Sequence, residues 1–218
     1  NTAKGSMIGA AGGGAAGAGL GAAIGALVNG GEGAKLGAAI GAGVGLAGGT
    51  VAGALIGRKM DKAAAAAAAV ENAEAEKAKD ANGLDCVKVT FDNGILFGTG
   101  KTTLQAGAQN SLKQFAQNVL NVYTDCDVAV QGFASSDGSD ATNLTLSQSR
   151  ADAVKNYLIG SCGVNTNQIK SSVGFGEDPS HLIMKADGTE DREASRRVEV
   201  YLYASEQMIK AANEGTLK

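Results

Sequence analysis

Several short segments contain residues whose types and spacing could support a chemical function. The first is Gly98-Thr99-Gly100-Lys101-Thr102. It follows a predicted strand and precedes a predicted helix, as a phosphate-binding loop does. That motif needs two glycines five positions apart before Lys-Thr, so that backbone N–H groups wrap the phosphates. The residue five before Gly100 is Ile95, and Gly94 misses by one. A turn with a helix cap explains the segment better than a nucleotide-dependent enzyme does.

The other reactive side chains do not form a catalytic pattern. The chain has a single His, His181, and no Trp, which disfavours a catalytic triad and a zinc site. Asp137, Asp140 and Asp152 are scattered acids on what reads as a solvated face. We therefore expect a protein that is not an enzyme and needs no metal or other cofactor.

Three cysteines are present, Cys86, Cys126 and Cys162. In the predicted order of elements, Cys126 begins a strand and Cys162 follows the next helix. A right-handed β-α-β crossover brings those two ends to the same edge of the sheet, which predicts a Cys126–Cys162 disulfide in an oxidising compartment. Cys86 also begins a strand, so another pairing and three free thiols remain as alternatives.

Composition divides the 218 residues into two regimes. Twenty of the 33 glycines lie between Gly5 and Gly57, whereas all nine aromatic residues lie at or after Phe91. The first 57 residues cannot form an ordinary core, because Gly and Ala have too little side chain to fill one. The formal net charge of −3 offers no basic patch for nucleic acid.

Glycine recurs every four residues within the first regime, which places it on one stripe of a helix. Two uncharged runs, Met7 to Val28 and Leu36 to Ile56, flank a turn at residues 29–33. Each is long enough to cross a hydrocarbon core of about 30 Å, and small residues at this spacing let helices approach closely. We predict a membrane-associated glycine-zipper hairpin over residues 1–57, against the alternative of a disordered linker.

Residues 58–83 read as a connector. Arg58-Lys59-Met60-Asp61-Lys62 ends the apolar run, and an Ala/Glu/Lys-rich stretch of strong helix formers follows. A helix from Arg58 to Ala81 would reach about 36 Å. We predict a semi-rigid helical stalk that holds a soluble domain away from the zipper.

Residues 84–203 have the alternation of apolar and polar residues that an ordinary α/β domain shows. The order β-α-β-α-β-β predicts a two-layer α+β sandwich, followed by a short frayed helix in the tail, residues 204–218. The expected strands are 86–91 and 95–97, paired around a turn at 92–94, then 127–133, 169–173 and 197–203, with helices from 102 or 103 to 120 and from 146 to 159.

Three motifs follow one another along this domain: Gly132-Phe133-Ala134-Ser135-Ser136-Asp137-Gly138 with Asn143 and Leu146-Ser147-Gln148-Ser149-Arg150-Ala151; Val173-Gly174-Phe175-Gly176-Glu177-Asp178-Pro179; and Ser195-Arg196-Arg197-Val198-Glu199. They closely resemble the G-H-T-D-x-x-G, N, L-S-x-x-R-A, V-G-x-G-E-x-x-P and N-R-R-V-E signatures of OmpA-like (OmpA/MotB C-terminal) peptidoglycan-binding domains. With the preceding zipper, the chain is similar to outer-membrane lipoproteins that join these two modules.

The resemblance implies a ligand and a site. The ligand of the family is the diaminopimelate stem peptide, whose side chain carries a carboxylate and an ammonium. Arg150 matches the Arg that receives the carboxylate, Asn143 the loop Asn that shapes the site, and Arg196 or Arg197 the Arg pair that borders it. Ordinary strand-edge charge is the alternative for Arg196 and Arg197.

One departure concerns the ammonium. The family's acidic partner is Ser135 here, and a hydroxyl supplies no counter-charge. Asp137, two residues away, is the expected substitute, and Asp137→Ala is expected to weaken binding of the stem peptide.

The resulting expectation is a non-catalytic tether of the bacterial cell outer membrane to peptidoglycan, with the C-terminal domain in the periplasm. A lipid-bearing Cys just before Asn1 would fit the resemblance, and the zipper offers a contact for a homo-oligomer or an envelope complex. The alternative is a structural or interaction subunit of an outer-membrane complex whose domain no longer binds cell wall strongly.

Overall fold

The computed structural model describes residues 51–80 and 83–217, so most of the predicted zipper hairpin lies outside the described residues. The described elements follow one another in this order: α3 (Val51–Ala68), β1 (Ala73–Lys79), β2 (Asp85–Asp92), α4 (Asn93–Leu96), α5 (Ala106–Phe115), the π-helical turn η2 (Ala116–Leu120), β3 (Cys126–Phe133), α6 (Asp140–Gly160), β4 (Ile169–Gly174), the 3-10 turn η3 (Pro179–His181), α7 (Arg192–Ser195), β5 (Arg197–Ala204) and α8 (Glu206–Asn213).

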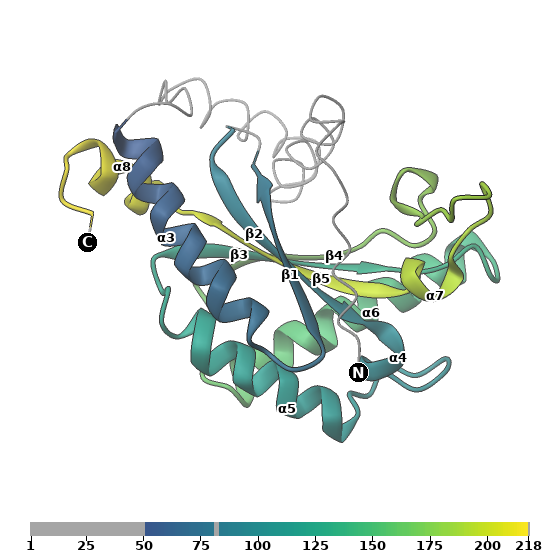
Figure 1. Cartoon of the computed structure of the whole chain (residues 1–218). Coiled ribbons are helices and arrows are strands. Elements are labelled where there is room, and N and C mark those ends of the chain that lie inside the picture. Colours follow the sequence, from purple (N-terminus) through teal and green to yellow (C-terminus); the bar gives the residue numbers. More distant parts are fainter. Residues whose placement is uncertain (1–50, 81–82, 218) are drawn as a thin grey trace, which may run out of the picture.

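The strands form one sheet (Figure 1). Their order across that sheet is β1-β2-β5-β3-β4. Neighbouring strands are antiparallel, except that β3 and β4 are parallel. A parallel pair needs a crossover, and α6 supplies it between β3 and β4. From β2 to β5 the predicted β-α-β-α-β-β order and the α/β class are confirmed.

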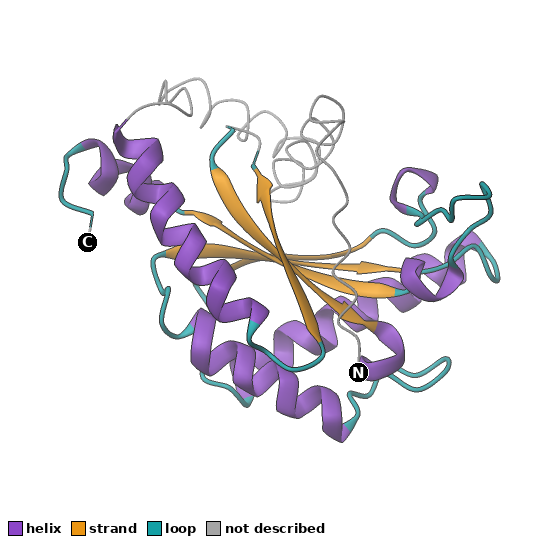
Figure 2. Ribbon diagram, in the orientation of Figure 1, coloured by secondary structure: helices purple, strands orange, loops and turns teal. Residues whose placement is uncertain are grey.

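The main core lies between the helices and one face of the sheet (Figure 2). Alternate strand residues such as Val89, Val130 and Val200 are fully buried there, together with Leu112 of α5 and Val154 of α6. Because successive side chains of a strand point to opposite faces, this alternation fixes the register of the sheet against the helices.

The predicted helix from Arg58 to Ala81 is wrong in its second half. Helix α3 ends at Ala68, and Asn72 adopts a left-handed conformation with φ of 58°, which Asn tolerates better than most residues. The chain then turns back, and residues 73–79 pair with β2 along their whole length. Ion pairs such as Lys79–Asp85 at 2.6 Å support that pairing. Partnership with a strand outweighs the local helix propensity of Ala, Glu and Lys.

Helix α3 is also not a free stalk. Ile56, Met60, Ala63 and Ala67 follow one helical stripe and are fully buried in the main core. They bring α3 against β1, β2 and α8. The predicted divisions at residues 57/58 and 83/84 therefore do not separate independent parts, because residues 51–80 share the core of the domain.

Capping residues explain two smaller differences from the prediction. The predicted strand at 95–97 is wrong: Asp92 caps a helical turn, α4, by accepting a hydrogen bond from Gly94 N at 2.5 Å. Helix α6 begins six residues before the prediction, because Ser139 caps it. The tail does form a short helix, α8, whose Met208 and Ile209 are buried in the core.

The predicted Cys126–Cys162 disulfide is wrong, since all three cysteines are free thiols. Cys126 is buried at the start of β3. Burial raises the pKa of its thiol most, Asp125 raises it further, and Lys59 lowers it. Cys162 is half-buried. Burial raises the pKa of its thiol, and the charge of Lys113 lowers it. The crossover does bring both residues to one end of the sheet, because β3 and β4 are parallel, but no bond joins the two thiols.

Among residues 51–80 and 83–217, no helix has both the length and the apolar character needed to cross a membrane.

Candidate functional site

Helix α6 carries the central side chains of the site on its buried stripe. Asn143, Ser147 and Arg150 occupy the first turns of that stripe, and Val154 and Leu158 continue it into the core. The polar residues therefore face inward at the end of the helix that lies beside the loop after β3. This arrangement places Arg150 inside the protein rather than on its surface.

Two glycines let α6 approach the sheet closely. A Cβ on Gly132 of β3 would lie 2.2 Å from Ser147 O, and a Cβ on Gly174 of β4 would lie 2.1 Å from Gln148 N. Both clashing atoms belong to the backbone, which cannot swing aside. Gly132 and Gly174 thus fix the depth at which α6 seats Asn143 and Arg150.

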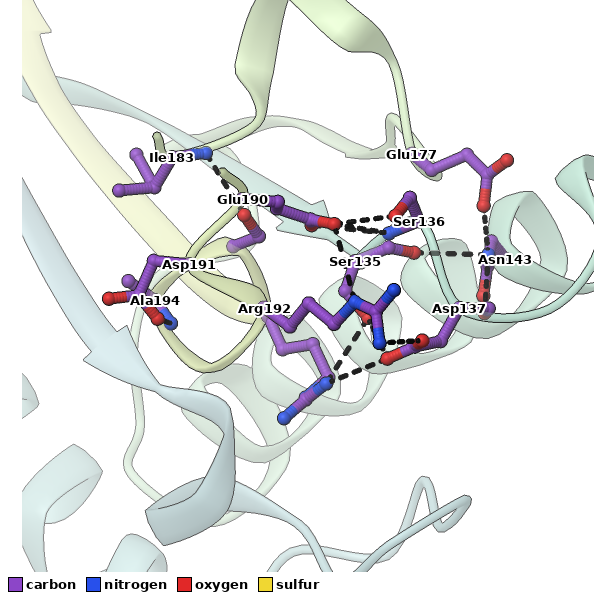
Figure 3. A network of polar contacts seen from close by, with 12 residues as sticks. Ser135, Ser136, Asp137, Asn143, Glu177, Ile183, Glu190, Asp191, Arg192 and Ala194 are labelled. Atoms are coloured by element: carbon purple, nitrogen blue, oxygen red, sulfur yellow. Dashed lines mark hydrogen bonds and ion pairs between the residues drawn. The ribbon is translucent and has the colours of Figure 1, made fainter. Parts of the chain in front are cut away.

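Asn143 joins two loops at the mouth of the site (Figure 3). Its Nδ2 donates to Ser135 O at 3.1 Å and to Asp137 O at 2.9 Å, and it also bonds to a carboxylate oxygen of Glu177. The Nδ2 donors of Asn143 are therefore engaged in contacts within the protein. Asn143 shapes the site as a positioning residue, by fixing the loop that carries Ser135 and Asp137.

Asp137 is already paired with arginine. Its Oδ1 lies 3.0 Å from Arg192 Nη1, and its Oδ2 lies 3.4 Å from Arg196 Nη1. Ser135 is buried beside it, donates to Asp137 Oδ2 at 3.3 Å and accepts from Arg196 Nη1 at 3.2 Å. The loop residue that departs from the family pattern is thus part of a connected polar network (Figure 3).

Arg150 is only 3% exposed, yet among the described residues no carboxylate forms an ion pair with it. Its Nε donates to Lys101 O at 3.1 Å, and its guanidinium lies 5.3 Å from the centre of the Phe97 ring. Burial, with a smaller contribution from Arg196, lowers the pKa of Arg150. Arginine nevertheless stays protonated in proteins, so the site holds a fixed positive charge.

These side chains line one pocket of about 370 Å³. Five of the six predicted site residues contribute to it, and the sequence prediction missed the rest of its wall. The predicted members are Ser135, Asp137, Asn143, Arg150 and Arg196, and the additional ones are Asn93, Gly94, Phe97, Thr99, Gly100, Ala134, Leu146 and Glu193.

Arg197 does not line this pocket. Its Nε donates to Glu199 Oε1 at 2.7 Å, its Nη1 donates to His181 O and Ser195 O, and its guanidinium lies 4.2 Å from the centre of the Phe133 ring. Arg197 is therefore a buried structural cation, and Arg196 is the member of the pair that borders the site.

The missed residues come from segments far away in the sequence. Asn93 is the first residue of α4, Phe97 follows its last residue, and Glu193 lies in α7. Residues 98–102, whose spacing fails as a phosphate loop, supply Thr99 and Gly100 to the pocket and the Lys101 carbonyl to Arg150. No local motif marks these positions. The nearest signal is the closeness of Glu193 to the Ser195-Arg196-Arg197 motif.

A second pocket, of about 530 Å³, adjoins the first and shares Glu193 and Arg196 with it. Its other walls include Ser136, Lys185 and Glu190. The two pockets together can hold more than one residue of an extended ligand.

Comparison with known proteins identifies this part of the chain, because residues 96–197 match the model of the OmpA family. This chain carries an OmpA-like domain. The matched segment contains β3, α6 and β4, and every charged residue that lines the first pocket.

The OmpA-like domain is similar to curated proteins of the bacterial envelope. The Escherichia coli (strain K12) protein named "Probable lipoprotein YiaD" is 33% identical over 118 residues, which cover 54% of this chain and 52% of that protein. Outer membrane protein A of Bordetella avium is 33% identical over 118 residues, covering 54% and 58%. The chain therefore spans little more than half the length of these relatives.

The fold also matches the solved structure of the cell wall anchor of the T6SS from Pseudomonas aeruginosa. The TM-score is 0.51 at 21% identity, and the match covers 67% of this chain and 97% of that one. At this identity the likeness concerns the fold.

Proposed function

We propose that this chain is a non-catalytic envelope protein whose OmpA-like domain binds peptidoglycan, through the free carboxylate of a diaminopimelate stem peptide. The observation that carries the proposal is Arg150, a buried guanidinium without a carboxylate partner among the described residues, at the wall of an open pocket. A buried cation gains most from an anion that reaches it. A bidentate carboxylate is the natural complement of a guanidinium.

The comparisons support a place for this protein in the cell envelope. One relative is named as a lipoprotein, another as an outer membrane protein, and a structure of the same fold is described as a cell wall anchor. We extend these properties to the chain as a proposal: it lies at the outer membrane, with the OmpA-like domain in the periplasm. In this arrangement residues 1–50 provide the membrane contact and the domain grips the wall.

The test is retention of the full chain, in mild detergent, on purified diaminopimelate-type peptidoglycan. Arg150→Gln removes the charge and is expected to weaken binding by about 10- to 150-fold, the equivalent of losing one charge-assisted contact of about 1.5–3 kcal/mol. Lys155→Gln is the matched control, since it removes a positive charge from the same helix outside the pocket.

Two results would contradict the proposal. Equal retention of wild type and Arg150→Gln would remove Arg150 from the site. No retention of the wild type would favour the alternative, a structural or interaction subunit that uses the domain to bind protein.

A further inference from the structure

The charges of the first pocket do not all neutralise one another. Four charged side chains line it: Asp137, Arg150, Glu193 and Arg196. Asp137 and Arg196 form an ion pair at 3.4 Å, and Asp137 forms a second ion pair with Arg192 at 3.0 Å. Within residues 51–80 and 83–217, Arg150 and Glu193 have no ion-pair partner. As far as the described residues go, the pocket therefore presents one cation and one anion without an ion-pair partner.

A second observation points to the same part of the wall. Asn93 is 5% exposed and lines the pocket, and its Oδ1 is buried without a hydrogen-bond partner among the described residues. Its backbone N donates to Arg196 O at 3.2 Å, which anchors Asn93 beside the α7–β5 segment that carries Glu193. An unsatisfied buried acceptor is costly. A ligand that donates hydrogen bonds would remove that cost.

We propose that Glu193, assisted by Asn93 Oδ1, forms an ammonium subsite in the pocket whose carboxylate subsite is Arg150. The ligand class is a side chain that bears a carboxylate and a primary ammonium, so that each charge meets an opposite one. The inference rests on the proposed function, because it names how the same pocket distinguishes one ligand from another.

Glu193 suits this role better than Asp137 does. The Asp137 carboxylate lies within 3.4 Å of two guanidinium groups, so its charge is already compensated and an ammonium placed there would also meet two cations. Ser135 offers a hydroxyl and no charge. Glu193 is exposed and lines both pockets, so its carboxylate can turn toward the ligand without breaking a side-chain hydrogen bond or ion pair to any described residue.

The experiment compares two synthetic stem peptides ending in diaminopimelate, one with the side-chain amine free and one with that amine acetylated. Affinities for the full chain in mild detergent are measured by isothermal titration calorimetry. We expect the wild type to prefer the free amine by about tenfold, as for one charge-assisted contact. Glu193→Gln is expected to reduce that preference below about twofold. Glu71→Gln, which removes an exposed carboxylate outside the pocket, is expected to retain it.

The outcomes distinguish failure of the ammonium subsite from failure of the proposed function. A preference that survives in Glu193→Gln, or one that is lost only in Asp137→Asn, would overturn the ammonium subsite. Equal binding of both peptides by the wild type, still dependent on Arg150, would also overturn it and leave the proposed function standing. If the wild type binds neither peptide, or if Arg150→Gln changes nothing, the proposed function fails.

Discussion

At the scale of single residues, the main feature of the pocket is that the described residues give the Arg150 guanidinium few polar partners. Lys101 O accepts one hydrogen bond and Phe97 provides an aromatic face, but neither offers a negative charge. Burying a cation without a counter-ion costs free energy. A ligand that supplies the missing charge offsets that cost, which is why we propose that a carboxylate binds at Arg150.

The cysteines give a residue-scale prediction about reactivity. Burial raises the pKa of Cys86 and of Cys126 to about 12, so at pH 8 only about one thiol in ten thousand is ionised at either position. Cys162 is half-buried, and burial raises its pKa less. We expect iodoacetamide at pH 8 to label Cys162 first in the native protein.

Peptide mapping by mass spectrometry would check this order. In guanidinium chloride all three cysteines should react at similar rates, which serves as the control. Rapid native labelling of Cys86, or a Cys126–Cys162 bridge in the unreduced protein, would contradict the structure.

At the scale of elements, the contact between α6 and the sheet sets the geometry of the site. Gly132→Ala would place a Cβ 2.2 Å from Ser147 O. Because backbone must move to relieve that overlap, we expect a loss of about 1–3 kcal/mol in the free energy of unfolding. The displaced helix should also weaken peptide binding, since it carries Arg150.

Gly107→Ala is the matched control for this substitution. Gly107 lies in α5, and a Cβ there would meet no atom within 4 Å. In a helix, Ala is favoured over Gly, so we expect stabilisation of about 0.5–1 kcal/mol. Urea unfolding of the three proteins would measure both effects, and equal stability of Gly132→Ala and wild type would refute the close packing.

At the scale of the whole molecule, α3 and β1 are integral to the domain. Met60 is fully buried in the main core, so Met60→Ala should lower the free energy of unfolding by about 2–4 kcal/mol. Lys62→Ala, at an exposed position of the same helix, should change it by less than about 0.5 kcal/mol. Urea unfolding measures both, and a neutral Met60→Ala would restore the picture of a free stalk.

The proposed membrane contact leads to a second prediction at the scale of the whole molecule. If residues 1–50 provide the membrane contact, the full chain should sediment with vesicles of outer-membrane lipid, whereas a chain beginning at Val51 should stay in the supernatant. The shorter chain keeps every described element, so its peptidoglycan binding should persist. Sedimentation of both chains would place the membrane contact within the domain.

The sequence alone determined the features that depend on local pattern. Alternating apolar residues located β2, β3, β4 and β5, and apolar helical spacing located α5 and the main part of α6. The motifs around Ser135, Arg150 and Arg196 pointed to segments that line the first pocket, because the spacing of a motif reflects a local backbone shape.

Only the tertiary structure decided the features that depend on partners. Ala73–Lys79 is a strand because β2 lies beside it, despite its helix-forming residues. Arg196 and Arg197 are adjacent in the sequence, yet one borders the pocket and the other is enclosed with Glu199. Arg196 caps α7 in an extended conformation and Arg197 begins β5, and successive side chains of an extended chain point to opposite sides. Asn93, Phe97 and Glu193 join Arg150 only because the sheet brings distant segments together. The pocket charges that no described residue pairs are likewise a property of the folded chain, because pairing depends on distance in space.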